Sequence, residues 1–118
     1  MLCWRRHLSS LDNEEDVRMK ILALEHELSG ATAGQFQQYA NDEARRVWEL
    51  HQAGVIRELY FRADRNEAVL ILECKSVIEA HEILETLPFV QAGLISFEVI
   101  SLKAYSGFER LFIKHLST

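Results

Sequence analysis

The chain has 118 residues, the length of one domain, and its composition excludes several classes of protein. With 48% hydrophobic and 26% charged residues it can build a core, so an intrinsically disordered chain is excluded. The net charge of −5 lacks the basic excess that phosphate-backbone binding needs, so we expect no nucleic-acid partner. No apolar run approaches the roughly 20 residues that cross a bilayer, and 2 cysteines make neither a disulfide framework nor a four-ligand zinc site. We therefore expect a cytoplasmic protein with free thiols and no membrane partner.

Residues 1–18 show neither helical nor strand periodicity, and Ser9 and Asp12 interrupt the apolar run that a secretory signal needs. We predict that this segment is a flexible N-terminal extension. Translation would then start naturally at Met19, where the first strongly apolar segment begins. The alternative is a short helix from about Leu11 that packs on the body of the protein.

Residues 20–28 alternate like a strand, which ends at Ser29 and Gly30. Thr32 with Gln35 is a capping-box signal for a helix, and Gly54 is its expected left-handed cap. Two alternating segments rich in branched and aromatic residues, 55–62 and 68–74, predict a β-hairpin.

Ser76 with Glu79 is a second capping signal, and it predicts a short helix that Pro88 prevents from continuing. A loop at 91–93 and an alternating segment at 94–103 then predict a last strand. The order is strand, helix, strand, strand, helix, strand. It predicts an α+β, ferredoxin-like βαββαβ domain over residues 19–105, with both helices on one face of a four-stranded antiparallel sheet.

The other face of this sheet would be too apolar to remain in water. The residues that we place on it are Ile21, Ala23, Ile56, Tyr60, Val69, Ile71 and Ile100. A second copy is the simplest cover, so we predict a homodimer, or a larger homo-oligomer, in which two sheets face each other and enclose a space.

From Val47 through Tyr105 the chain resembles the muconolactone delta-isomerase family of the dimeric α+β barrel superfamily. The matching segments are Arg57-Glu58-Leu59-Tyr60, Leu87-Pro88-Phe89, and Phe97-Glu98-Val99 with Leu102. The resemblance implies ferredoxin-like subunits that dimerise sheet to sheet and can build larger rings. It also implies that, with neither metal nor organic cofactor, a proton moves between carbons of a small lactone acid.

The chain departs from the family pattern at two places. Glu58 stands where the enzymes carry a basic or imidazole side chain, and the tail 105–112 differs from their ends. The resemblance therefore carries over to the fold more directly than to the reaction.

If the alternation fixes the faces, one group of polar residues shares the face turned away from the helices. The group is Glu25, Glu27, Glu58, Tyr60, Arg62, Glu73 and Glu98. Crowding and partial burial raise the pKa of a carboxyl, which suits a general base or acid, and Glu25 and Glu98 are the first candidates. Tyr60 would hydrogen-bond a carbonyl or enolate oxygen. Arg62, with Glu58 and Glu73 beside it, would bind a small acidic organic ligand.

Two alternatives remain open for these residues. Acids and arginines on adjacent strands often pair only structurally, contributing roughly 0.2–1 kcal/mol. A register error of one residue would exchange the faces and make Arg57, in place of Arg62, the anchor for the ligand. The function then divides between a cofactor-free isomerase and a non-catalytic dimeric module that binds a small molecule or self-assembles. A cofactor-free monooxygenase, a reaction of sister families, is a third possibility.

The histidines and cysteines give no site signal, because no two histidines stand at metal-ligand spacing with an acidic third ligand. We expect no metal, and structural roles for His26, His51 and Cys74. The tail at 106–118 is different, because Phe108, Leu111 and Phe112 follow Tyr105 at half-helical spacing. It would pack on its own subunit or reach across the dimer, and we favour a lid over the mouth of the barrel.

Overall fold

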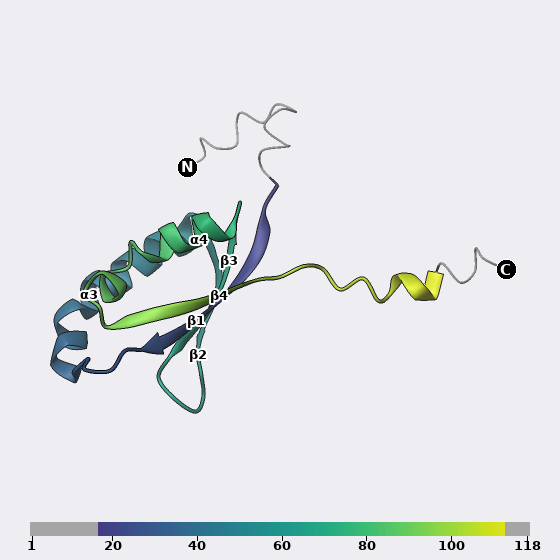
Figure 1. Ribbon diagram of the computed structural model, residues 1–118. Coiled ribbons are helices and arrows are strands. Elements are labelled where there is room, and N and C mark those ends of the chain that lie inside the picture. Colours follow the sequence, from purple (N-terminus) through teal and green to yellow (C-terminus); the bar gives the residue numbers. More distant parts are fainter. Residues whose placement is uncertain (1–16, 113–118) are drawn as a thin grey trace.

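The computed structural model describes residues 17–112, and Figure 1 shows a sheet with its helices on one face. The elements are β1 (Met19–Glu27), α3 (Ala33–Gln52), β2 (Ile56–Phe61), β3 (Ala68–Cys74), α4 (Val77–Leu84), α5 (Pro88–Gln91) and β4 (Ile95–Ser101). All strand pairs are antiparallel and the strand order is β2-β3-β1-β4. This is the ferredoxin-like arrangement, so the predicted fold is confirmed. The predictions for residues 1–16 lie outside the described residues.

The helix boundaries follow the capping signals. The Thr32 hydroxyl accepts a hydrogen bond from the Gln35 N–H at 3.2 Å, and the Gln35 side chain accepts one from the Thr32 N–H at 2.9 Å. Gly54 follows α3 with φ of +82°, a conformation that glycine adopts readily. At α4 the Ser76 hydroxyl accepts from the Glu79 N–H at 3.0 Å. Both predicted N-caps are confirmed.

One short helix was not predicted. Pro88 does not only end the preceding helix; it is the first residue of α5. Proline suits this position because its fixed φ is helical and its missing N–H would have no partner there. The Phe89 ring meets the Phe36 ring of α3 edge to face, with centroids 5.1 Å apart. This contact fixes α5 against the N-terminal half of α3.

The core lies between the sheet and the helices, and it corrects the predicted face of β1. Ile21 and Ala23 are fully buried on the helix side, whereas Leu22 and Leu24 point to the uncovered face. Placing Ile21 and Ala23 on the uncovered face was therefore wrong. Four consecutive apolar residues give β1 two apolar faces, and the smaller side chain of Ala23 suits the space beneath the helices.

A β-bulge corrects the predicted face of Ile56. Ile56 pairs with Leu72 and is buried, but Glu58 pairs with Ile71, so the register shifts at Arg57. The extra residue of a bulge reverses the alternation. Ile56 therefore faces the helices, while Glu58 lies on the uncovered face as predicted.

The last described residues, 103–112, form an extended arm. Figure 1 shows them leaving the end of β4 and projecting away from the body. The ladder ends where the Leu102 N–H donates to the Lys20 carbonyl at 2.9 Å. The large apolar side chains of the arm, Tyr105, Phe108, Leu111 and Phe112, are 60–75% exposed. The predicted tail beyond residue 112 lies outside the described residues.

The burial of the sheet residues predicts which of them contribute most to stability. Leu72 is fully buried between the sheet and the helices, so Leu72→Ala should lower the free energy of unfolding by about 2–5 kcal/mol. Leu59→Ala, the same change at a side chain that is 40% exposed, should cost less than half as much. Urea unfolding of both variants measures the difference, and equal losses would contradict the different burial of these two side chains.

Candidate functional site

Two glutamates hold the strands together where β1 and β3 separate. The β1–β3 pairing ends at Leu24 and Val69. Just beyond it, the Glu25 carboxylate accepts a hydrogen bond from the Ala68 N–H, and Glu67 Oε2 accepts one from the Glu27 N–H, both at 2.9 Å. Each carboxylate thus satisfies a backbone donor that the ladder leaves free. β1 meanwhile continues alongside β4, so the sheet opens at this end.

A hollow of about 450 Å³ lies beneath α3 at the open end of the sheet. It is lined by Glu25, Ala40, Glu43, Ala44, Val47, Leu59, Tyr60, Phe61, Ala68, Leu70, Leu87, Phe89 and Phe97. The volume falls within the roughly 300–1,000 Å³ of small-molecule sites. Its lining is mostly apolar, and among the described residues the carboxylates that line it belong to Glu25 and Glu43. A small ligand bound there would contact two carboxyl groups in an otherwise apolar cavity.

The helix supplies the second acid. Glu43 lies on the side of α3 that faces the sheet, and one carboxylate oxygen accepts a hydrogen bond from the Phe89 N–H at 2.8 Å. That N–H belongs to the first turn of α5, where backbone donors have no helical partner. Glu43 is therefore held between two helices with its carboxyl over the hollow.

Burial changes the protonation of both acids. Loss of solvent raises the pKa of Glu25 above its ordinary 4.5, and the hydrogen bond from Ala68 only partly opposes this. Loss of solvent likewise raises the pKa of Glu43, and the nearby charge of Glu25 raises it further. Both carboxyls therefore hold a proton more strongly than an exposed glutamate does.

Sequence reasoning missed Glu43, although a signal was present. The apolar stripe of α3 runs through Phe36, Ala40, Val47 and Leu50, and Glu43 occupies the position between Ala40 and Val47 at the same spacing. An acid inside an apolar stripe is an uncommon choice, because an unpaired buried charge is costly.

A second hollow of about 450 Å³ adjoins the first along α3. It is lined by Glu25, Glu27, Ala33, Phe36, Gln37, Ala40, Phe61, Asn66 and Phe89. Both hollows share Glu25, Ala40, Phe61 and Phe89. Together they form one elongated depression between α3 and the β2–β3 hairpin, which we call the groove.

Of the predicted site residues, Glu25 and Glu27 lie on the other side of the sheet from the one expected. Glu25 pairs across the sheet with Phe97 and lines the groove beneath α3. Its prediction as a residue of the uncovered face is therefore wrong, and so is that for Glu27, which pairs with Ile95. The cause is the two-sided apolar pattern of β1 described above.

The remaining predicted acids lie on the uncovered face, in pairs. Glu98 approaches His26 at 3.6 Å, and Glu73 lies 3.4 Å from Arg57 and 3.8 Å from Lys20. Within the described residues these are contacts between side chains of neighbouring strands. They fit the alternative that these acids have a structural role. Exposed pairs of this type contribute about 0–1 kcal/mol each.

Tyr60 and Glu58 form a pair on β2. The Tyr60 hydroxyl donates a hydrogen bond to Glu58 at 2.9 Å, and this bond raises the pKa of the tyrosine. Tyr60 also borders the groove from the edge strand. Its pairing with Val69 puts Tyr60 on the uncovered face of the sheet, as predicted.

Arg62 is engaged in the hairpin loop. Its Nε and Nη2 donate to the two oxygens of Asp64 at 2.9 and 2.7 Å. This fork raises the pKa of Arg62 and lowers that of Asp64. Neither Arg62 nor Arg57 is among the residues that line the groove.

Other polar groups hold local structure. His51 Nδ1 lies 2.9 Å from the Ile56 carbonyl, and Cys74 is buried, which raises the pKa of its thiol. Within residues 17–112, no three His, Cys, Asp or Glu side chains come close enough to hold a metal ion. None of the helices in that range is long and apolar enough to cross a membrane.

Comparison with known proteins places the chain in a family. Residues 17–107, well over half of the sequence, match the muconolactone delta-isomerase family. The chain belongs to this family. No curated protein matches the sequence significantly. The family match spans β1 to β4 and therefore includes every residue of the groove.

The raised pKa values of Glu25 and Glu43 predict how stability depends on pH. Since folding raises both values above 4.5, their favourable contribution is complete below pH 4.5 and is lost as the pH rises through the folded pKa values. The Glu43→Gln variant cannot ionise at that position. The free energy of unfolding of the natural protein should therefore fall with pH relative to Glu43→Gln.

Urea unfolding across a pH series that spans these values measures this difference. Glu82→Gln, at an exposed position of α4, is the matched control and should track the natural protein. A difference that is flat, or that grows in favour of the natural protein as the pH rises, would contradict the raised pKa of Glu43.

Proposed function

We propose that this protein isomerises a small lactone acid, or a related carbonyl compound, by moving a proton between two of its carbons. The observation that carries the proposal is the pair Glu25 and Glu43, two carboxyls with raised pKa that line one apolar hollow. Membership of the muconolactone delta-isomerase family supports the same class of reaction.

In the proposed reaction Glu25, ionised, removes a proton from a carbon next to the substrate carbonyl. The C–H electron pair moves into an enolate, and Glu43, protonated, donates a hydrogen bond to the enolate oxygen. The proton on Glu25 then returns to a different carbon of the conjugated system. A new C–H bond forms, the double bond is displaced, and both glutamates regain their starting states.

Burial explains why these residues suit the task. A carboxylate with an ordinary pKa is a weak base towards carbon, whereas a desolvated one holds a proton more strongly. The hydrogen bond from Ala68 fixes the Glu25 side chain, and that from Phe89 fixes Glu43. Both groups are therefore positioned before a substrate arrives, which lowers the entropic cost of the reaction.

A substrate carboxylate would need a cation, and Arg62 is our candidate. It follows Phe61, which lines both hollows, but it must exchange Asp64 for the substrate. Arg57 is the second candidate, held by Glu73. Arg62→Ala should then raise KM more than it lowers kcat, because the interaction would be made in both ground and transition state.

The proposal predicts how strongly the replacement of each acid lowers turnover. Glu25→Gln should lower kcat/KM for muconolactone by about 100- to 10,000-fold, the range for loss of a general base. Glu43→Gln should lower it by about 100- to 1,000-fold, as for loss of an oxyanion donor. Glu82→Gln, on the exposed side of α4, is the control and should leave turnover unchanged.

Glu98 is the competing candidate on the uncovered face. A larger loss in Glu98→Gln than in Glu25→Gln would move the site to that face, between two facing sheets. If the natural protein binds muconolactone but does not convert it, the second candidate function stands, a binding module that uses the same groove. The acids Glu58, Glu73 and Glu98 are each paired with a neighbouring side chain, as structural acids are, and this favours that alternative over catalysis on the uncovered face.

The uncovered face also supports a proposal about assembly. It carries Leu24, Val69 and Ile71, each only half-buried, and Ile100, which is exposed. We propose that a second copy covers this face and forms a homodimer, since water would otherwise contact a continuous apolar surface.

Sedimentation velocity tests the dimer directly. Ile71→Glu places a charge in the centre of the proposed interface and should convert the dimer to single copies. Ile78→Glu, the same change at a 71%-exposed position on α4, should leave the dimer intact. A natural protein that sediments as a single copy would overturn the proposal.

A further inference from the structure

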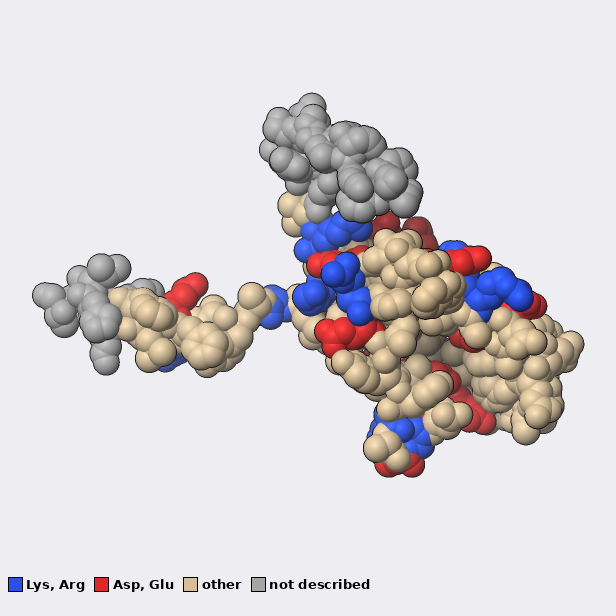
Figure 2. Space-filling model, turned by 180° about the vertical axis from the view of Figure 1, so that it is seen from behind, with Lys and Arg blue, Asp and Glu red and all other residues tan. Residues whose placement is uncertain are grey.

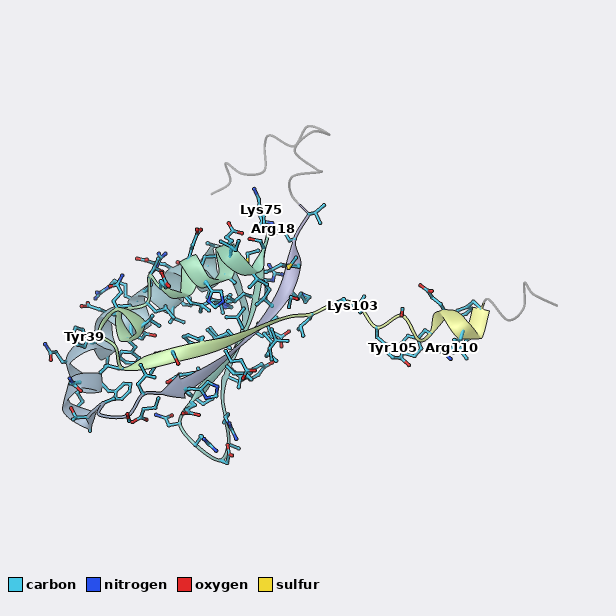
Figure 3. The ribbon with its side chains drawn as sticks, in the orientation of Figure 1. Arg18, Tyr39, Lys75, Lys103, Tyr105 and Arg110 are labelled. Carbon is cyan, nitrogen blue, oxygen red and sulfur yellow. The ribbon has the colours of Figure 1, made fainter. Side chains whose placement is uncertain are left out.

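The arm presents an apolar surface that its own body does not cover. Figure 2 shows it as a mostly uncharged projection from the body, and Figure 3 shows Tyr105 and Arg110 well away from the sheet. Phe108, Leu111 and Phe112 are each at least 60% exposed. Clustered aromatic side chains at such exposure mark a surface that binds another surface.

The arm has a shape of its own before it binds. The Tyr105 and Phe108 rings meet edge to face with centroids 5.0 Å apart. The Leu111 N–H donates to the Phe108 carbonyl at 3.0 Å and begins a helical turn. A side chain at Gly107 would collide with the Tyr105 ring, so this position needs a glycine. A preformed aromatic cluster loses little conformational entropy when it docks.

The groove is the matching surface on the body. Its outer wall is the edge strand β2, where Leu59, Tyr60 and Phe61 all have exposed side chains. Phe61 is 67% exposed although it lines both hollows. The open side of the groove therefore exposes apolar side chains against which the aromatic cluster of the arm can pack.

The arm and the groove lie at opposite ends of the same sheet. The groove is built where β1 ends and β4 begins, next to Glu25 and Phe97. The arm starts at the other end, where Leu102 bonds to Lys20, and it continues away from the body (Figure 1). An arm with this direction reaches a second molecule more directly than its own groove.

We infer that the arm of one protomer docks on the groove of its partner and closes it over the Glu25 and Glu43 carboxyls. The exchange is reciprocal, so that each protomer gives one arm and receives one, and the assembly closes on itself. Phe108, Leu111 and Phe112 would exclude water from a hollow that is open in the single chain. The purpose of this closure rests on the proposed function, but the contact can be tested without turnover.

Cross-linking between two differently tagged chains tests the contact. One chain carries Phe61→Cys and the other Phe108→Cys, both with Cys3→Ser, and they are co-expressed as full-length proteins and treated with a short bismaleimide. Buried Cys74 stays in place. A covalent heterodimer should form at least tenfold more than when Ile78→Cys replaces Phe61→Cys. Ile78 is the control because it is an exposed apolar residue on α4, outside the groove.

A second pair guards against damage to the arm by the first substitution. Asn66→Cys on one chain with Ser106→Cys on the other leaves every aromatic side chain in place, and Asn66 lines the groove. Capture of the arm by the Phe61→Cys chain or the Asn66→Cys chain supports the exchange. Equal or greater capture by the Ile78→Cys chain, no heterodimer with either pair, or only internal cross-links in a chain carrying both substitutions of a pair would overturn it.

The result separates this inference from the proposed function. Selective heterodimers in a protein without isomerase activity would leave the exchange standing and remove the reaction. Turnover in a protein that forms no selective heterodimer would support the reaction and overturn the exchange of arms.

Discussion

The structure depends on how β1 and β3 part beyond Leu24 and Val69. Two side-chain carboxylates take over from the ladder there, Glu25 on the Ala68 N–H and Glu67 on the Glu27 N–H. A buried donor without a partner would cost roughly 1–3 kcal/mol, so these bonds let the sheet open without that loss. The same geometry directs Glu25 into the space beneath α3. The stability of this end and the chemistry of the acid therefore have one origin, and the second cannot be changed without affecting the first.

The two faces of the sheet differ in the burial of their ionisable groups. The helix-covered face carries few ionisable groups, but burial alters the two that line the hollow, Glu25 and Glu43. The uncovered face carries more ionisable groups, and its acids remain partly or fully exposed and lie close to neighbouring side chains, as Glu98 does to His26. In our proposals the reaction takes place beneath α3, and the dimer contact is made by the opposite face of the sheet. If the arm docks as we infer, closure of one protomer's groove would depend on contact with its partner.

The sequence predicted the fold through local signals with one structural meaning. Thr32 and Ser76 cap their helices through local hydrogen bonds that do not depend on where the helices pack. Gly54 follows a helix end because glycine readily adopts the positive φ needed there. The faces of the strands needed information that is not local. Leu22 and Ile21 are equally apolar, so only packing decides which of them the helices cover. Glu43 could be recognised as unusual within its stripe, but its partner at Phe89 belongs to a helix that appears only when Pro88 starts a new turn.

The bulge at Arg57 has a consequence beyond the direction of Ile56. β2 is an edge strand of the sheet, and it carries the exposed apolar residues Leu59 and Phe61. Such an edge can pair with strands of other molecules and start aggregation. The register shift breaks the even spacing of backbone donors and acceptors along that border. An edge strand with a bulge pairs poorly with a regular strand of another molecule. The protein can therefore keep apolar side chains beside its groove and still resist aggregation through that edge.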